Sequence, residues 1–333
     1  MWGVTRLTNY WLIITTFVFL IISNGVFSVI ERIQKISRDK LSLVKGVLKD
    51  QYLLKSNLII IKIGAVTHSS GSKSGNESVL MPGDHYDNNV VGTLYSLKAM
   101  QGSDIKTLIF SSSVSVFGCA KYNAINEEYS LQPVSSYVRT KKHIEEIMSD
   151  ISASDTQWKF IFLRYFNLSG DHGSGLSLES PLGVTNNVMP YASQVAFYSL
   201  SCVAVYGDNY PAKDGIGVRD YIHVVDLARG HLVSSNHPVT QKEFESPSKF
   251  NRGTGKALGV VELVTAFEKV EGSETTNKIN DRRLGELAYC YAHNKGKKIL
   301  YWSADKSLRE NFKTIWRSQK SYVDVIAIDK DWS

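Results

Sequence analysis

The fold is decided by the stretch TLIFSSS (residues 107–113), which is followed by YVRTKKHIEEIMSDI (137–151) and KFIFLRYFN (159–167). The first and third segments are continuous β-branched and aromatic runs, which are typical of buried strands. The middle segment has apolar residues at helical spacing: Ile144, Ile147, Met148 and Ile151. A strand, a helix and a strand in this order predict neighbouring strands of a parallel sheet.

Further segments extend this pattern towards the N-terminus. We predict a helix over 28–39, a buried strand over 57–64, a polar loop over 68–78 and a helix over 86–100. The predicted fold class is therefore α/β, a Rossmann-like parallel sheet with helices on both faces. In such sheets ligands bind outside the carboxyl ends of the strands, where Ser113 and Asn167 both fall.

The sequence pattern changes after residue 168, where long glycine-rich loops occur at 169–187 and 207–220. Loops of this kind in a compact enzyme usually carry binding residues. We predict a cofactor-binding domain over 1–168 and a smaller α/β substrate domain over 169–333.

Composition excludes several classes of protein. The 333 residues are 43% hydrophobic and 21% charged with a net charge of +6, which is ordinary for a globular protein. Without a basic stripe interleaved with aromatic residues, nucleic acid is not an expected partner. The three cysteines, Cys119, Cys202 and Cys290, form no CxxC pair, and no histidine cluster has metal-ligand spacing. We therefore expect no metal site and a reducing, cytoplasmic location.

The N-terminus carries a nearly unbroken apolar run at 10–22, followed by VFSVI at 26–30. A buried parallel strand is the interpretation that we favour, because such strands also read as continuous apolar runs. A membrane anchor over 10–30 is the alternative, since about 20 apolar residues can span a bilayer.

Tyr137 and Lys141 are four residues apart on the predicted helix and therefore share a face. An ammonium beside a phenol favours the phenolate and is expected to lower the tyrosine pKa, so that Tyr137 can act as a base. The Ser113 hydroxyl, at the end of the preceding strand, can hydrogen-bond the oxygen on which such a base works.

With these motifs in place, the sequence resembles the UDP-glucose 4-epimerases of the extended short-chain dehydrogenase/reductase family. The matching stretches include YDNNVVGT (86–93), FSSSVSVFG (110–118), YVRTKKHIEEI (137–147), WKFIFLRYFN (158–167), DGIGVRDYIHVVDLARGH (214–231) and NRGTGK (251–256). The resemblance runs from about residue 22 to 318. It places NRGTGK in a substrate-domain loop, although its glycines could be mistaken for a dinucleotide fingerprint.

What the resemblance implies is epimerisation at C4 of UDP-hexoses through a transient 4-keto sugar, with bound NAD as hydride carrier. The implied catalytic residues are Ser113, Tyr137 and Lys141. The implied cofactor-binding residues are Lys73, Asn89, Ser111, Tyr137, Lys141 and Tyr165. The implied partner is the UDP-hexose substrate, and a homodimer is expected.

For the substrate, the resemblance implies contacts from Ser113, Asn167, Asn186, Asn187, Val188, Arg219, Arg283, Glu286 and Cys290. Guanidinium groups suit a diphosphate, which agrees with the two arginines. At the position of Cys290 some family members carry a tyrosine and others a small residue. A small side chain leaves room at C2 of the sugar, so we hypothesise that N-acetylated UDP-hexosamines are also accepted.

The chain departs from the family at its start, because it has no GxxGxxG loop for the NAD pyrophosphate. Run 12–22 then corresponds to the family's second strand, Leu20 stands where an acidic residue binds the adenine ribose, and residues 67–72 read as an insertion. The sequence thus predicts a sheet lacking its first βα unit. Two interpretations follow: an epimerase with an aberrant NAD site, or a non-catalytic relative that binds UDP-sugar or a partner subunit.

Overall fold

The structure is a computed structural model that describes most of the chain. The described residues are 19–22, 28–37, 42–60, 63–118, 125–176, 203–208, 217–240, 244–259, 262–263, 265–266, 268, 277–280, 289–292 and 299–330.

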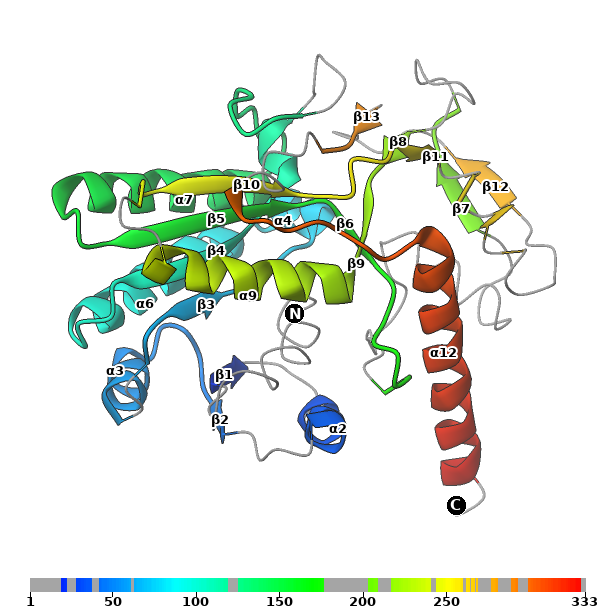
Figure 1. The fold of residues 1–333 in the computed structure, drawn as a ribbon, viewed down its shortest axis with the longest axis horizontal. Helices are drawn as coiled ribbons and strands as arrows, with labels where there is room; N and C mark the ends of the chain where they lie inside the picture. The colour runs from blue at the N-terminus through cyan, green and yellow to red at the C-terminus, as the bar shows by residue number, and fades with distance from the viewer. Residues whose placement is uncertain are drawn as a thin grey trace.

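The central element is a parallel sheet with strand order β10-β5-β4-β3 (Figure 1). Its strands are β3 (Val66–His68), β4 (Thr107–Ser113), β5 (Lys159–Tyr165) and β10 (Ser248–Arg252). The predicted strands over 107–113 and 159–167 are thereby confirmed, and they pair directly, with Ser113 opposite Tyr165.

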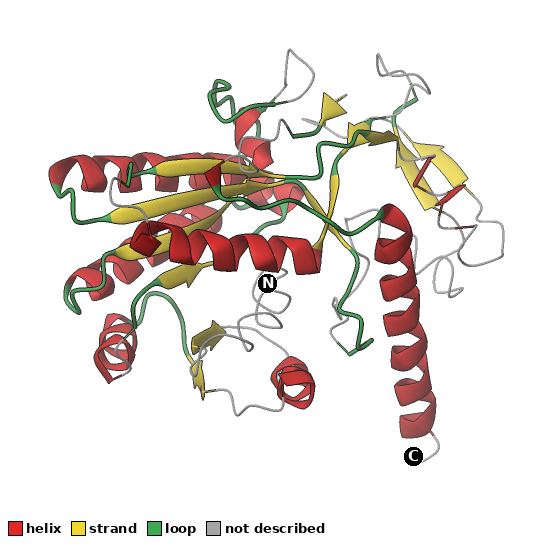
Figure 2. Ribbon diagram, in the orientation of Figure 1, coloured by secondary structure: helices red, strands yellow, loops and turns green. Residues whose placement is uncertain are grey.

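Helices cover both faces of this sheet (Figure 2). On one side lie α6 (Gly92–Gln101) and α7 (Ser136–Ser154), and on the other lies α9 (Val224–Thr240). Successive strand residues point to opposite faces, which explains the two apolar clusters. Phe110, Phe160 and Phe162 pack with Ile144 and Met148 on the α7 side. The cluster on the α9 side consists of Ile109, Ile161, Leu163, Ile222, Leu227, Phe250, Leu300 and Trp302.

The N-terminal part forms a separate βαβ unit. Strand β1 (Phe19–Ile22) pairs in parallel with β2 (Ser42–Lys45), and α2 (Ser28–Ser37) connects them. The predicted helix over 28–39 is confirmed at 28–37. Of the predicted strand over 10–22, the structure describes 19–22, which form a strand, and residues 10–18 lie outside the described part. Among the described helices, none combines the length and the apolar character needed to cross a membrane.

Strand β3 pairs with β4 and, within the described residues, with no strand of the β1–β2 unit. The predicted lack of the first βα unit concerns a part of the chain that includes residues 1–18, which lie outside the described residues, and it stays a prediction. The predicted insertion at 67–72 is partly a strand, because its first two residues, Thr67 and His68, belong to β3.

The predicted strand over 57–64 is wrong. Residues up to Ile60 belong to α3 (Gln51–Ile60), where the side chain of Ile60 is 75% exposed. A short apolar run does not distinguish strand from helix by periodicity. The missed signal is Asp50, whose side chain accepts a hydrogen bond from the Leu53 N–H and so marks a helix start.

The polar 68–78 segment is a loop only in part, since it runs into α4 (Gly75–Leu80). The predicted 86–100 helix is built from α5 (Pro82–Tyr86), a π-helical turn (Asp87–Val91) and α6.

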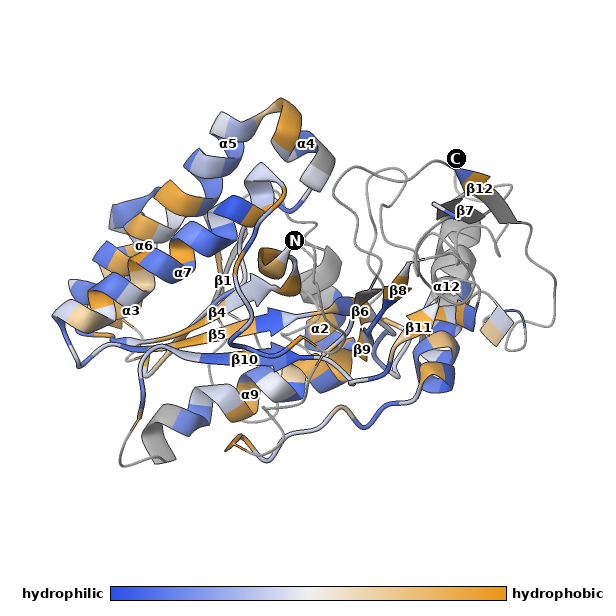
Figure 3. Cartoon of the chain, turned by 90° about the horizontal axis from the view of Figure 1, so that it is seen from above, coloured by the Kyte–Doolittle hydropathy of each residue, from blue (hydrophilic) through white to orange (hydrophobic). Residues whose placement is uncertain are grey.

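Beyond residue 166 the chain forms smaller sheets beside the main one (Figure 3). Strand β6 (Asn167–Ser169) pairs with β9 (Tyr221–His223), and β7 (Val203–Tyr206) pairs with β12 (Asn277–Asn280). A third sheet joins β8 (Val218–Arg219), β11 (Leu258–Gly259) and β13 (Tyr289–Cys290). The long helix α12 (Leu308–Lys330) stands apart from the main sheet (Figure 1).

Candidate active site

The end of β4 carries the central hydroxyl groups of the site. Strand β4 ends at Ser113, whose side chain accepts a hydrogen bond from the Ser115 N–H and starts a 3₁₀ turn. Ser135 caps the following helix α7, because its side chain accepts from the Val138 N–H. The cap fixes the first turn of α7, which places the Tyr137 phenol near enough to the Ser113 side chain for that serine to act on its pKa.

Lys141 lies one turn further along α7 and is buried. Its Nζ donates to the backbone carbonyl of Ser111 over 2.9 Å and lies 4.7 Å from the centre of the Phe110 ring. Burial lowers the pKa of Lys141 to about 8, although the carboxylate of Glu145 opposes this shift. The Lys141 ammonium is therefore held at the end of β4, and it loses its proton more easily than an exposed lysine does.

The predicted lowering of the Tyr137 pKa is wrong. Burial is the main cause that raises the pKa of Tyr137 above its ordinary value, and the neighbouring Tyr165 adds to the rise. The hydrogen bond with Ser113 acts in the opposite direction. Spacing on the helix indicated a shared face, but it gave no measure of how strongly the surroundings exclude water from the phenol.

A loop between β3 and α4 lies against this centre and is held by Asn89. The buried Asn89 side chain accepts from the Ser72 N–H over 2.7 Å and donates to the Ser72 carbonyl and the Thr140 hydroxyl, both over 3.0 Å. Gly71 in this loop has φ of +149°, and a Cβ there would lie 3.6 Å from Lys141 Nζ. The loop therefore passes close to Lys141, and Lys73 follows with its side chain exposed.

Five of the six residues predicted to hold a cofactor lie at or beside the carboxyl ends of β4 and β5: Asn89, Ser111, Tyr137, Lys141 and Tyr165. The sixth, Lys73, is exposed on the adjoining loop, and its contact with a cofactor stays a prediction. Burial raises the pKa of Tyr165 to about 12, so this phenol keeps its proton at neutral pH.

The substrate residues Asn167, Arg219 and Cys290 are brought together by backbone pairing around Asp220. Cys290 is paired with Arg219 between β13 and β8. The Asp220 N–H donates to the Cys290 carbonyl over 3.0 Å, and the Asn167 N–H donates to the Asp220 carbonyl over 3.1 Å. Cys290 also packs in the apolar cluster that the Tyr137 ring joins. Asn186, Asn187, Val188, Arg283 and Glu286 lie outside the described residues.

The Asp220 carboxylate fixes the backbone of the NRGTGK loop (251–256) by accepting its N–H groups. It accepts from the backbone N–H groups of Thr254 and Gly255 over 2.9 Å each, and from the Thr254 hydroxyl over 2.7 Å. The Ala292 N–H is a further donor at 3.3 Å. These N–H groups are thus engaged by a carboxylate and are not turned to a phosphate, in agreement with the sequence interpretation. Sequence reasoning missed Asp220, although its place directly after Arg219 in the VRDYIH motif was a signal.

A second buried acid, Glu145, connects the elements that carry the site. Glu145 accepts from the Ser112 hydroxyl over 2.6 Å and from Arg164 Nε and Nη2 over 3.0 and 2.5 Å. The bidentate ion pair joins α7 to β5, and the Ser112 hydrogen bond joins the same carboxylate to β4 between Ser111 and Ser113. Both residues were missed because partners far apart in sequence leave no local pattern.

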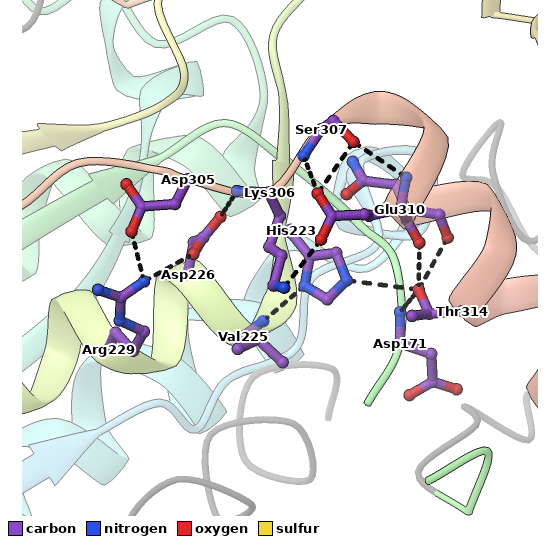
Figure 4. A network of polar contacts seen from close by, with 11 residues as sticks. Asp171, His223, Val225, Asp226, Arg229, Asp305, Lys306, Ser307, Glu310 and Thr314 are labelled. Atoms are coloured by element: carbon purple, nitrogen blue, oxygen red, sulfur yellow. Dashed lines mark hydrogen bonds and ion pairs between the residues drawn. The ribbon is translucent and has the colours of Figure 1, made fainter. Parts of the chain in front are cut away.

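His223 supports packing, as the sequence interpretation expected (Figure 4). Its Nδ1 accepts from the Val225 N–H over 3.1 Å, and its Nε2 lies 3.3 Å from the Thr314 hydroxyl of α12. Beside it, the Asp226 side chain accepts from the Lys306 N–H over 2.8 Å. These contacts fasten α12 to α9. In the part of the chain that the structure describes, no cluster of three histidine, cysteine or acidic residues could hold a metal ion.

Comparisons with known proteins agree with this geometry. The family model for GDP-mannose 4,6 dehydratase matches residues 8–315. The UDP-glucose 4-epimerase of Bacillus subtilis is 39% identical over 304 residues, covering 91% of this chain and 89% of that protein.

Two solved structures are close in fold. The UDP-glucose 4-epimerase of Stenotrophomonas maltophila, with bound NAD and formylated UDP-arabinopyranose, has a TM-score of 0.92 at 32% identity, covering 97% of this chain and 96% of that one. The enzyme from Bifidobacterium longum, in complex with NAD⁺ and UDP, has a TM-score of 0.90 at 36% identity, with 95% of each chain covered. With this site and these relatives, the chain belongs to the UDP-glucose 4-epimerase family of NAD-dependent, Rossmann-fold isomerases.

Proposed function

We propose that the chain interconverts UDP-glucose and UDP-galactose by inverting C4 of the sugar. The observation that carries the proposal is the buried Lys141 ammonium, which donates to the Ser111 carbonyl over 2.9 Å at the end of β4, with the buried Tyr137 phenol one helical turn before it and Ser113 near enough to act on the pKa of that phenol. Acid–base work on a sugar hydroxyl needs a proton acceptor and a second hydroxyl within reach of the same oxygen. The alternative of a non-catalytic relative is not favoured, because the epimerase relatives match over most of their length.

The cofactor that these residues fit is NAD, which both solved relatives contain. The buried Asn89, the Lys141 ammonium and the Gly71 backbone form one polar wall, and a side chain at Gly71 would crowd Asn89 Oδ1 at 3.2 Å. We infer that Asn89, Ser111, Tyr137, Lys141 and Tyr165 hold the nicotinamide half. A contact from Lys73 is also proposed. When bound, NAD⁺ supplies the hydride acceptor and donor of the reaction.

Side chains of the protein then transfer the proton of the sugar 4-hydroxyl. Tyr137 takes the proton of the sugar 4-hydroxyl and later returns it, and Ser113 holds the same oxygen. Because burial raises the pKa of Tyr137, its phenolate needs positive charge in its surroundings. Lys141 remains mostly protonated below pH 8 and supplies such a charge.

For the substrate we propose that the uridine diphosphate is held by Asn167, Asn186, Asn187, Val188, Arg219, Arg283 and Glu286. Cys290 is placed to border C2 of the sugar, because it packs in the cluster that contains the Tyr137 ring. A division of labour between 1–168 for NAD and 169–333 for the UDP-sugar is part of this proposal, although α9 and β10 pack on the main sheet. The family membership also supports a homodimer, and an odd number of cysteines without a CxxC pair supports a cytoplasmic location.

The test is to incubate the purified chain with UDP-galactose, with and without added NAD, and to follow UDP-glucose by proton NMR. We expect conversion to an equilibrium mixture, stimulated by added NAD because the sequence has no glycine-rich pyrophosphate loop. Thermal stabilisation by UDP without any conversion, at saturating NAD, would instead identify a binding protein.

A further inference from the structure

The hydroxyl of Thr140 joins the first turn of α7 to the buried side chain of Asn89. Thr140 is itself fully buried and directly precedes Lys141 in the sequence. Its hydroxyl donates to the backbone carbonyl of Tyr137 over 2.6 Å and accepts from Asn89 Nδ2 over 3.0 Å. Because a carbonyl can only accept, the single hydroxyl proton is committed to Tyr137, and an oxygen lone pair is left for Asn89. The direction of both hydrogen bonds is therefore fixed.

Asn89 carries this connection from α7 to the loop between β3 and α4. Its second amide proton is donated to the Ser72 carbonyl over 3.0 Å, and its Oδ1 accepts from the Ser72 N–H over 2.7 Å. Asn88 Nδ2 is a further donor to the same oxygen over 3.0 Å. An asparagine amide has two protons to donate and two lone pairs that accept, so all four are used within the protein. Asn89 therefore shapes the proposed cofactor wall through the loop that it holds.

The backbone of Asn89 is fixed from a second direction. Asn89 lies in the π-helical turn Asp87–Val91, and single π-turns inside helices occur frequently at functional sites. Its carbonyl accepts from the Thr93 hydroxyl over 2.5 Å, and the same hydroxyl oxygen lies 2.8 Å from Nε2 of His68, the last residue of β3. The π-turn is thus anchored to β3 through its backbone and to α7 through the Asn89 side chain.

The loop held in this way, residues 69–74, passes close to Lys141. A Cβ at Gly71 would lie 3.2 Å from Asn89 Oδ1 and 3.6 Å from Lys141 Nζ. A shift of Ser72 would therefore move the backbone that lies beside the Lys141 ammonium. The position of this loop decides how closely the two sides of the proposed NAD pocket approach each other.

We propose that Thr140 is a positioning residue, whose hydroxyl holds the 69–74 loop against Lys141 through Asn89 and so preorganises the wall that binds NAD. The proposal rests on the proposed function for its ligand. A hydroxyl that served only its own helix would need only a bond within that helix, such as the bond that Ser149 donates to the Glu145 carbonyl over 2.7 Å. The additional bond from Asn89, 51 residues away in sequence, is what a purely helical role leaves unexplained.

The first measurement is hydrogen exchange at the Ser72 N–H, followed by NMR without added nucleotide in wild type and in Thr140→Val. Valine keeps the branched shape and removes the hydroxyl, so that Asn89 loses one acceptor and its hold on Ser72 loosens. We expect the Ser72 N–H to exchange about tenfold faster relative to the amides of β5. Equal acceleration at Ser72 and in β5 would indicate general destabilisation and overturn the proposal, as would unchanged exchange at Ser72.

Thr140→Ser is the rescue variant, because it keeps the hydroxyl. It should return the exchange of the Ser72 N–H to within about twofold of wild type. Ser149→Ala is the matched control, since it removes a hydroxyl of the same helix whose bond stays within that helix. It should leave exchange at Ser72 unchanged. A folded Thr140→Ser protein in which Ser72 exchanges as fast as in Thr140→Val contradicts the proposal.

The wild-type chain supplies a readout that does not depend on whether Thr140→Val folds. Both Nδ2 protons of Asn89 are hydrogen-bonded, one of them to Thr140, so both should exchange at least tenfold more slowly than those of a solvent-exposed amide. The signals are assigned by their loss in Asn89→Asp. Exchange of either proton at the rate of an exposed amide would overturn the proposal.

The affinity for NAD tests the functional part of the proposal. Thr140→Val should raise the dissociation constant for NAD about tenfold and leave that for UDP within about twofold, because the 69–74 loop borders only the proposed NAD pocket. Thr140→Ser should restore the affinity for NAD. Unchanged NAD affinity in a folded Thr140→Val protein, or an equal loss of affinity for NAD and UDP, contradicts the proposal.

The two proposals fail in different ways. A wild-type chain that neither binds NAD nor converts UDP-galactose overturns the proposed function, and exchange at Ser72 still decides whether Thr140 holds the loop. An active chain in which Thr140→Val leaves NAD affinity unchanged overturns the role of Thr140 alone.

Discussion

The buried ammonium of Lys141 destabilises the fold at neutral pH. Burial lowers its pKa from 10.5 to about 8, so the unfolded chain binds the proton more tightly than the folded one. The penalty is fully present below pH 8 and is relieved as the pH rises towards 10.5. We expect Lys141→Met to raise the free energy of unfolding by about 1–2 kcal/mol at pH 7, after the lost bond to Ser111 is deducted.

Urea denaturation at pH 7 and pH 10 checks this expectation, and the gain should be smaller at the higher pH. Lys142→Met is the matched control, because Lys142 is the next residue of α7 and forms a partly exposed pair with Glu146. It should change stability by less than about 0.5 kcal/mol. A destabilised Lys141→Met protein would show that the ammonium supports the fold and is not held there for function.

Substitutions of Cys290 test which UDP-sugars the substrate site accepts. Cys290 is buried with Tyr137, Val114 and Phe166 around it, so a larger residue must project into the adjoining space or displace its neighbours. Cys290→Tyr should reduce turnover of UDP-N-acetylglucosamine more than tenfold and spare UDP-galactose, since one steric clash exceeds 1.4 kcal/mol. Cys290→Ala should retain both activities. Equal loss of both substrates in a folded Cys290→Tyr protein would contradict this assignment.

At the scale of elements, Asp220 holds together the strands that present Arg219 and Cys290. Its carboxylate accepts from three backbone N–H groups, those of Thr254, Gly255 and Ala292. Asp220→Asn replaces one acceptor oxygen by an NH₂ group, which faces N–H donors and cannot accept from them. We expect a loss of about 2–4 kcal/mol in unfolding free energy and weaker binding of UDP.

Thermal unfolding and UDP titration measure these two effects. Asp208→Asn, at an exposed position near β7, serves as the control and should match wild type. If a folded Asp220→Asn protein bound UDP as tightly as wild type, the Asp220 carboxylate would not be needed to hold the substrate site in place.

The elements that sequence predicted well are those with a strong and long periodic pattern. The β4, α7 and β5 segments were recognised because apolar runs and a helical stripe alternate there over sixty residues. The C-terminal half of α3 was mistaken for a strand because its isoleucines give the same short apolar run in either state. Contacts such as Ser111 with His231 could not be predicted, because 120 residues separate the partners.

At the scale of the whole molecule, the resemblance predicted the fold and the family, both of which the relatives confirm, and it proposed Ser113, Tyr137 and Lys141 as the reaction centre. It could not establish how the electrostatics of the folded site act on Tyr137, whose pKa burial raises. The carboxyl edge of the main sheet assembles Ser113, Tyr137 and Lys141 from β4 and α7.

The central claim is that the Tyr137 hydroxyl performs the proton transfer at the sugar 4-hydroxyl. The most direct test compares Tyr137→Phe with wild type in the UDP-galactose to UDP-glucose assay at saturating NAD, with UDP affinity measured in parallel. The account predicts a rate at least a hundredfold lower with UDP affinity within about threefold of wild type. A Tyr137→Phe protein that turns over UDP-galactose at the wild-type rate would contradict it.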